Sequence, residues 1–334
     1  MTSKIATSVL LIIVFGWQST AASPKPVAVF DEFWSLFADN YAFFELRNVD
    51  WEQQKKIYRP VSASTKNDDL FGILCRMIDP LNDGHVFVSQ GRKSCGSGKR
   101  LPWEANSDAI EDFIFKKYLK SGSKHSGAIT YGTIDAATGY IDIHHMQGCK
   151  SFLGRARRTA KEMDEALAVM KGARRIIIDV RFNGGGNDEC ALGFASRFTD
   201  ERRLVYSKET YYKGSYGSHR DLYISSDGIV NTTAKVIVLA SRATSSAAEM
   251  FVMAMMGVPQ VPIIGEPTRG IHSDIYMKKL PNGWQVGLSN QKYMLPDGTV
   301  YEKAGLPPHK FISFKGDVLE LGRDELLEQA LELH

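Results

Sequence analysis

The 334-residue sequence has little excess charge, few cysteines and no repeated segment. Its 41 lysines and arginines nearly balance 38 aspartates and glutamates, so the formal net charge is only +3. A charge this small and dispersed gives no reason to expect nucleic acid as a partner. The hydrophobic content of 43% is sufficient for the core of one large domain or two ordinary ones.

Long hydrophobic runs are equally scarce, and the chain has only one, near its N-terminus. Lys4 precedes the mostly apolar residues 5–17, and the small residues 19–23 follow. This pattern is typical of a signal peptide and is too short for a membrane-spanning helix with its usual flanks. We expect residues 1–22 to be cleaved, leaving an exported protein, periplasmic or secreted, without a membrane span. An uncleaved membrane anchor is the alternative.

The four cysteines are Cys75, Cys95, Cys149 and Cys190, and their spacings match no zinc motif. We therefore expect neither a metal nor another cofactor. An even number of cysteines in an exported chain permits two disulfides in three possible pairings, and we expect at least one to form.

The most informative stretch runs from residue 235 to residue 256. An apolar strand at 236–240 leads through a turn of small residues into a helix that is apolar on nearly all sides, and hence buried. Ser246 stands at the head of this helix, where free N–H groups and the helix dipole would stabilise an oxyanion. Ser246 with Glu249 is also a capping-box pattern, so this stretch alone leaves catalysis and helix capping both open.

A second buried strand, at 176–180, leads into the glycines Gly184, Gly185 and Gly186. Glycines at this position expose backbone N–H groups and allow another chain to approach closely. The segment has neither the Gly-Lys-Ser/Thr ending nor the G-x-G-x-x-G spacing of nucleotide-binding loops. An oxyanion-binding or peptide-binding loop fits it better than a phosphate loop.

The two halves of the chain differ in character. Helical patterns rich in aromatic residues fill 29–78, and His85 follows the Asp83-Gly84 turn at the start of a strand. Strands and helices alternate after residue 127. We predict an N-terminal helical domain at 23–125 that carries His85, and an α/β domain at 126–334 that includes a hairpin over residues 281–283.

Several separated motifs together resemble one protein family. Asp179 to Gly186, Ser246 to Glu249, Gly265 to Gly270, and Asp297-Gly298 with Glu302 and Gly305 resemble, in this order, the tail-specific or C-terminal-processing serine proteases. Tyr41 to Trp51 and Asp83 to His85 resemble the branch related to the tricorn core protease and the interphotoreceptor retinoid-binding modules.

This resemblance implies a ClpP/crotonase-like α/β core preceded by a small helical domain, with no apparent PDZ domain. It implies that Ser246 is the nucleophile and that the N–H of Ala247, with that of Gly184 or Gly185, forms the oxyanion hole. His85 would be the general base and Glu302 the acid that orients it.

Two residues depart from the family pattern. Ile271 occupies the position at which the bacterial branch has its catalytic lysine, and Gly84 occupies the position at which tricorn has a serine before the histidine. His272, next to the missing lysine, is a weaker candidate for the base. The predicted function is an exported serine-type peptidase acting on peptides or protein C-terminal tails. The alternative is a non-catalytic protein that binds an apolar ligand, and the sequence leaves the oligomeric state open.

Overall fold

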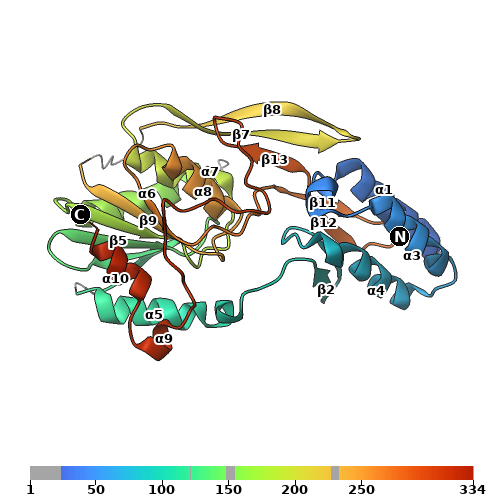
Figure 1. Cartoon of the computed structure of the whole chain (residues 1–334), viewed down its shortest axis with the longest axis horizontal. Coiled ribbons are helices and arrows are strands. Elements are labelled where there is room, and N and C mark those ends of the chain that lie inside the picture. The colour runs from blue at the N-terminus through green and yellow to red at the C-terminus, as the bar shows by residue number, and fades with distance from the viewer. Residues whose placement is uncertain (1–23, 121, 148–154, 227–232, 334) are drawn as a thin grey trace, which may run out of the picture.

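The computed structural model describes residues 24–120, 122–147, 155–226 and 233–333 (Figure 1). The predicted signal peptide at 1–22 lies outside these residues. None of the described helices is long and apolar enough to cross a membrane.

A seven-stranded sheet forms the centre of the larger part of the molecule. Its strands are β14 (Lys310–Phe311), β10 (Ile263–Gly265), β9 (Lys235–Ala240), β6 (Arg175–Asp179), β5 (Thr138–Ile143), β4 (Ile129–Thr133) and β3 (Lys124–Ser126), in this spatial order. The first five are parallel, and β4 and β3 continue the sheet in antiparallel pairing. Continuous apolar runs in β6 and β9 are buried, as expected for parallel strands covered on both faces.

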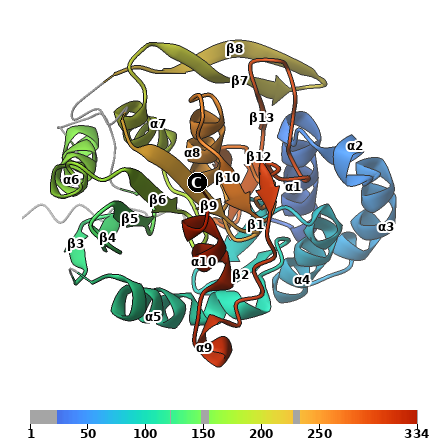
Figure 2. The same cartoon turned by 60° about the vertical axis from the view of Figure 1, so that its left-hand side comes forward.

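Helices cover both faces of this sheet (Figure 2). The core on one face takes in residues of α6 (Arg155–Val169), α7 (Asp188–Ala195) and α8 (Ala247–Met256). The core on the other face takes in residues of α5 (Ser107–Tyr118), α9 (Val318–Leu321) and α10 (Glu325–Leu331). Short 3-10 turns lie at η1 (Asp79–Leu81), η2 (Pro102–Asn106) and η3 (Ser196–Phe198).

The N-terminal part has a separate core. Helices α1 (Pro26–Asn40), α2 (Phe44–Arg47), α3 (Trp51–Ala63) and α4 (Asn67–Ile78) lie beside an antiparallel sheet in the order β11 (Ile275–Lys279), β12 (Gln285–Ser289), β1 (Phe87–Gln90) and β2 (Lys93–Gly96). Buried aromatic residues such as Phe33, Phe37 and Trp51 fill this core. The predicted hairpin over 281–283 is confirmed as β11 and β12.

Packing crosses the expected division at residue 125 in both directions. Strands β11 and β12 come from the second half of the sequence but complete the N-terminal sheet, where β12 pairs with β1. Helix α5 comes from the first half but packs on the central sheet. The sequence pattern predicted these elements but not the sheet that each one joins. Tertiary contacts decide which sheet edge a strand pairs with.

A third sheet bridges the two parts across the top of Figure 1. It consists of β13 (Gln291–Met294), β7 (Arg203–Tyr212) and β8 (Ser215–Ile224). At the tip of the β7–β8 ribbon, the Lys213 N–H donates to the Asp39 carbonyl at 2.7 Å and the Tyr216 hydroxyl donates to the Ala42 carbonyl at 3.0 Å. The ribbon thereby ties the α/β part to the end of α1.

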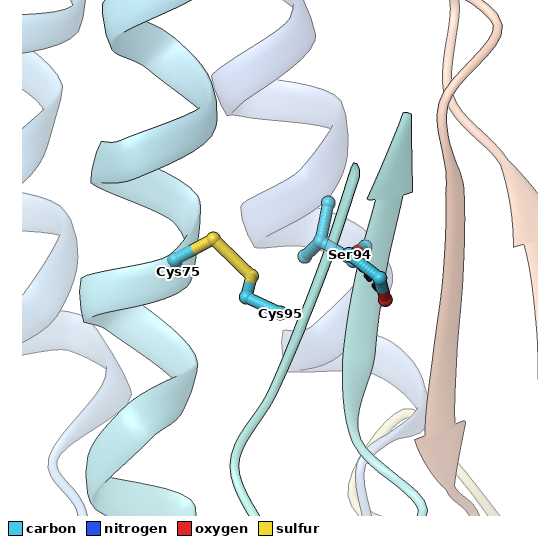
Figure 3. Close-up of a disulfide and its surroundings, with 4 residues drawn as sticks. Cys75, Ser94 and Cys95 are labelled. Atoms are coloured by element: carbon cyan, nitrogen blue, oxygen red, sulfur yellow. Dashed lines mark hydrogen bonds between the residues drawn. A yellow bond between two sulfur atoms is a disulfide. The ribbon is translucent and has the colours of Figure 1, made fainter. Parts of the chain in front are cut away.

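A disulfide joins α4 to β2 through Cys75 and Cys95, with 5.9 Å between their Cα atoms (Figure 3). The prediction of at least one disulfide is therefore confirmed. Cys149 lies outside the described residues.

A buried ion cluster fixes the end of β6. The Arg181 guanidinium, which is inaccessible to solvent, donates to Asp179 and to Asp324, each at 2.6 Å in its shortest contact. Asp324 also caps α10 by accepting the Leu327 N–H at 3.0 Å. One cation therefore pairs with two buried carboxylates and links the last helix to the strand that precedes the glycine loop.

Replacing Arg181 by methionine should strongly destabilise the fold, because it leaves Asp179 and Asp324 buried without their counter-ion. We expect Arg181→Met to lower the free energy of unfolding by about 3–5 kcal/mol, measured by urea denaturation. Arg59→Met, which breaks an exposed pair with Asp31, is the matched control and should leave the midpoint unchanged. Equal effects of the two variants would contradict this account of the cluster.

Candidate active site

Ser246 has an unusual backbone conformation. Its φ of 57° and ψ of −129° lie in a region that residues other than glycine rarely adopt, whereas a residue that only caps a helix has ordinary extended angles. The side chain is partly exposed between the buried neighbours Ser245 and Ala247. A strained serine between a strand and a helix is typical of nucleophiles in hydrolases with α/β folds.

The glycine loop lies directly against this serine. Gly185 has a φ of 101°, and a Cβ atom added to it would lie 2.6 Å from the Ser246 Cβ, so no larger residue fits there. The Gly185 N–H is already used, because it donates to the Asn183 side chain at 2.8 Å. Among the described residues, no group accepts a hydrogen bond from the N–H of Gly184 or of Ala247. Of the two glycines predicted for the oxyanion hole, the geometry therefore favours Gly184.

Glu249, in the first turn of α8, has a larger structural role than its place in a capping box indicated. Its carboxylate is fully buried and accepts four hydrogen bonds of 2.6–3.0 Å, from the Ser246 N–H, the Thr268 hydroxyl and the N–H groups of Gly270 and Ile271. The His272 Nε2 atom lies 3.0 Å from the same carboxylate. Burial alone would raise the Glu249 pKa, but the charge of His272 and these donors hold it below its usual value.

His85 is buried beside the glycine loop. The Asp83 carboxylate accepts its backbone N–H at 2.9 Å, and its ring lines a cavity of about 340 Å³ together with Gly184 and Ser245. Burial lowers the pKa of His85, so its neutral form is favoured. Within the described residues its Nδ1 atom has no hydrogen-bond partner, and the expected hydrogen bond to Ser246 is not formed.

His272 has the opposite electrostatic setting. It is 2% exposed, and its ring lies between two carboxylates, with Nδ1 3.9 Å from Glu302. Burial works against its charge, but the neighbouring Glu249 and Glu302 outweigh burial and raise the His272 pKa. A histidine held in its charged form cannot accept a proton, so this environment favours a structural role for His272.

Among the described residues, no hydrogen bond or ion pair joins Glu302 to His85. It accepts a hydrogen bond from Arg47 at 2.6 Å and one from the His272 N–H at 2.8 Å. Burial and the nearby charge of Asp83 raise the Glu302 pKa to about 7, against the opposing charges of His272 and Arg47. Glu302 was expected to reach His85 directly or through one hydroxyl or water, but the carboxylate that bonds to the His85 backbone is that of Asp83.

The two departures from the family pattern are physically coupled. A Cβ atom added to Gly84 would lie 2.5 Å from the Ile271 Cδ1 atom, so the isoleucine fills the space that a side chain at position 84 would need. Gly98 closes the other side, since a Cβ atom added there would lie 2.6 Å from the Gly84 Cα. The turn that carries His85 is therefore packed against the residue at the lysine position.

Comparisons with known proteins agree with this geometry. The model of peptidase family S41 matches residues 137–311, which is more than half of the chain. The chain belongs to peptidase family S41. A second model, the tricorn protease C1 domain, matches residues 26–79 within the N-terminal part.

Among curated relatives, the carboxy-terminal processing protease CtpA of Bacillus subtilis (strain 168) is 33% identical over 152 residues, which is 45% of this chain and 31% of that protein. The carboxyl-terminal-processing protease of Picosynechococcus sp. is 28% identical over 142 residues, or 42% of this chain and 33% of that protein. The chain thus matches about a third of the length of these curated relatives.

Among solved structures, a candidate peptidase from Parabacteroides merdae ATCC 43184 has a TM-score of 0.78 at 26% identity, covering 92% of this chain and 96% of that one. The tricorn protease has a TM-score of 0.58 at 15% identity, covering 92% of this S41 chain and 36% of that one, which shows a shared fold. The predicted family and α/β fold class are confirmed, and no PDZ domain is evident in the described residues.

Three residues of the site had no role in the sequence prediction. Arg47 pairs with Glu302, Asp83 bonds to the backbone of His85, and Asn183 shapes the glycine loop. Asp83 and Asn183 lie within two residues of predicted site residues, so their proximity in the sequence could have indicated a role in the site. Nothing in the sequence around Arg47 indicated a partner 255 residues away.

Coupling between positions 84 and 271 can be measured. Gly84→Ala should cost about 1–3 kcal/mol of unfolding free energy by overpacking against Ile271. Ile271→Val removes the clashing Cδ1 atom and should cost about 0.5–1.5 kcal/mol alone. We expect the double variant to be clearly more stable than the sum of the single effects in urea denaturation. Additive effects would show that the two positions are independent.

Proposed function

We propose that this S41 chain is a serine-type peptidase with Ser246 as nucleophile and His85 as general base. The observation that carries the proposal is the strained Ser246 at the head of α8, next to the unpaired N–H groups of Gly184 and Ala247. Such donors stabilise the negative charge that develops on a substrate carbonyl oxygen during acyl transfer.

In the proposed reaction, the neutral His85 ring takes the Ser246 hydroxyl proton as the serine oxygen attacks the peptide carbonyl carbon. The carbonyl oxygen becomes an oxyanion facing the N–H groups of Gly184 and Ala247. When the intermediate collapses, the carbon–nitrogen bond breaks and His85 returns its proton to the leaving amine. Water then hydrolyses the acyl-enzyme by the same steps, with His85 again as base. The two side chains must first come together, because Ser246 and His85 are not hydrogen-bonded in the structure.

The role of Glu302 follows from its contacts. It holds Arg47 and the backbone of His272, and His272 in turn contacts Glu249 at the head of the nucleophile helix. Glu302 therefore supports the site through this chain of contacts as a positioning residue. For Glu302 to bond to His85 directly, the two side chains would have to move together when substrate binds.

Acidic peptide tails are the proposed substrates. A second cavity of about 480 Å³ adjoins the His85 cavity, and both are lined by Gly84, Arg269 and Ile271. Among the described residues, no carboxylate lines it, and five cationic side chains do, namely Arg47, Lys99, Arg242, Arg269 and Lys303. Three of these have carboxylate partners outside the lining, Arg47 in Glu302, Arg269 in Glu104 and Arg242 in Glu266. This lining suits a carboxylate-bearing chain end and disfavours the alternative of an apolar ligand.

Export remains part of the proposal. The Cys75–Cys95 disulfide supports it, because disulfides persist in oxidising compartments such as the periplasm and the extracellular space. N-terminal sequencing of the mature protein should begin near residue 23, and an intact Met1 would contradict export by this signal.

Active-site labelling tests the nucleophile. A fluorophosphonate probe should label the folded protein, whereas Ser246→Ala and heat-unfolded protein should show no labelling. His85→Ala should retain its fold but lose at least about a hundredfold in kcat, the usual contribution of a general base. His219→Ala, an exposed histidine with carboxylate partners, is the control and should keep full activity. Labelling that persists in Ser246→Ala would overturn the assignment.

The pH profile distinguishes the two histidines. If His85 is the base, its lowered pKa keeps it neutral to lower pH, so the acid limb of kcat/KM should have its midpoint below about 6.5. If His272 were the base, its raised pKa would place that midpoint above about 6.5. Peptide hydrolysis measured from pH 4.5 to 9 gives the answer.

Substrate charge is testable in the same assay. We expect a peptide with an acidic, free C-terminal tail to have a higher kcat/KM than its neutral, amidated counterpart, with the difference shrinking at high salt. The Lys99→Glu/Arg242→Glu double variant should reduce this preference, whereas Lys171→Glu, before the N-terminal end of β6, should not. An unchanged preference in the double variant would exclude these cations from substrate binding.

A further inference from the structure

A second group of polar side chains lies at another cavity, of about 560 Å³, between α5 and the β3–β4 edge of the central sheet. Glu111 of α5 faces Asp142 of β5 and His144, which follows that strand. One nitrogen or oxygen atom from each of the three lies within 4.8 Å of the others. Asp142 and His144 are two residues apart along an extended segment, so their side chains point to the same side.

The Asp142 carboxylate lacks the partners that a buried charge requires. The residue is 1% exposed, and neither of its oxygens accepts a hydrogen bond from a donor in the described residues. The His144 Nδ1 atom lies 3.1 Å from Asp142 and 3.5 Å from Glu111. Two carboxylates and one imidazole nitrogen thus converge on a point that needs positive charge.

The second ring nitrogen of His144 has a hydrogen-bond partner that fixes the orientation of the ring. Its Nε2 atom lies 2.6 Å from the Thr130 hydroxyl, and that hydroxyl lies 3.0 Å from the His125 Nδ1. If Thr130 gives its proton to His125, it accepts the Nε2–H of His144, which leaves the His144 Nδ1 lone pair facing the carboxylates. Metal-binding histidines are held in this way, by a hydrogen bond from the ring nitrogen that does not touch the metal.

We propose that Glu111, Asp142 and His144 bind one divalent transition-metal ion, with Zn²⁺ as the best fit. Two carboxylate oxygens and one imidazole nitrogen form a ligand set that suits zinc and its neighbours. The ion would neutralise the two carboxylates, and the cavity leaves a coordination position open to water. No short sequence motif indicated this site, because Asp142 and His144 lie 31 and 33 residues after Glu111.

The site connects to the glycine loop through the backbone between its ligands. The Ile143 carbonyl accepts the Asn183 side chain at 2.7 Å, and the Met146 N–H donates to the Gly185 carbonyl at 2.8 Å. An ion bound by residues 142 and 144 would therefore hold the strand end on which the glycine loop rests. This role is positional and involves no contact with substrate.

Metal titration of the full mature chain tests the proposal. After treatment with a chelator, we expect one equivalent of Zn²⁺ to bind by calorimetry, and one equivalent of Co²⁺ to give a visible absorption band. Asp142→Asn and His144→Ala should each weaken Zn²⁺ binding at least tenfold. His219→Ala is the matched control, because His219 contacts Glu209 and Asp221 through opposite ring nitrogens, which one ion cannot bridge, and it should bind normally.

Two outcomes would overturn the proposal. One is the absence of stoichiometric Zn²⁺ binding, which would show that the three side chains bind protons and no metal ion. The other is an equal loss of binding in His219→Ala, which would show binding at the surface. Circular dichroism checks that each variant folds, and Glu111→Gln, on a less buried ligand, provides the same test if Asp142→Asn does not fold. Because metal binding is read without substrate, its failure is independent of the result for Ser246.

Discussion

The buried carboxylate of Glu249 is the interaction on which the arrangement of the candidate site depends. It gathers the Ser246 N–H at the head of α8 and the N–H groups of Gly270 and Ile271 from a segment that follows β10. A carboxylate removed from water must satisfy its oxygens within the protein, so all these donors are drawn to one point. The turn that carries Ser246 and the 268–272 segment are thereby fixed relative to each other, and the turn that carries His85 packs against that segment where Gly84 meets Ile271.

The pKa values of the two histidines shift in opposite directions, and contact with this carboxylate is part of the reason. His272 contacts it directly, so attraction exceeds the cost of burial and the His272 pKa rises. For His85 the cost of burial is the largest effect, and its pKa falls. The surroundings of His272 thus favour its charged form, whereas those of His85 favour its neutral form and leave one ring nitrogen without a partner in the described residues. Only the second state suits a general base.

The direction of the parallel strands explains why the candidate site residues lie in the same part of the fold. Strands β5, β6 and β9 run in the same direction, so the segments that follow them meet at one edge of the sheet. The end of β5 carries Asp142, with His144 directly after it, the segment after β6 carries the glycine loop, and the segment after β9 carries Ser246. Backbone hydrogen bonds between residues 143–146 and 183–185 join the first two, which links the proposed metal site to the proposed oxyanion hole.

The sequence by itself determined the local elements and the kind of chemistry. Apolar runs, a turn of small residues and a buried helix were sufficient to place Ser246 at the head of α8, because these patterns depend on neighbours along the chain. The motifs around residues 179–186 and 265–270 indicated the S41 family for the same reason. The tertiary structure alone decided which carboxylate serves which histidine, why Ile271 requires Gly84, and that β11 and β12 complete the N-terminal sheet. Most of these features depend on contacts between residues far apart in the sequence, such as Gly84 with Ile271 and Phe87 with Gly287, where burial and competition for donors, rather than local pattern, determine the partner.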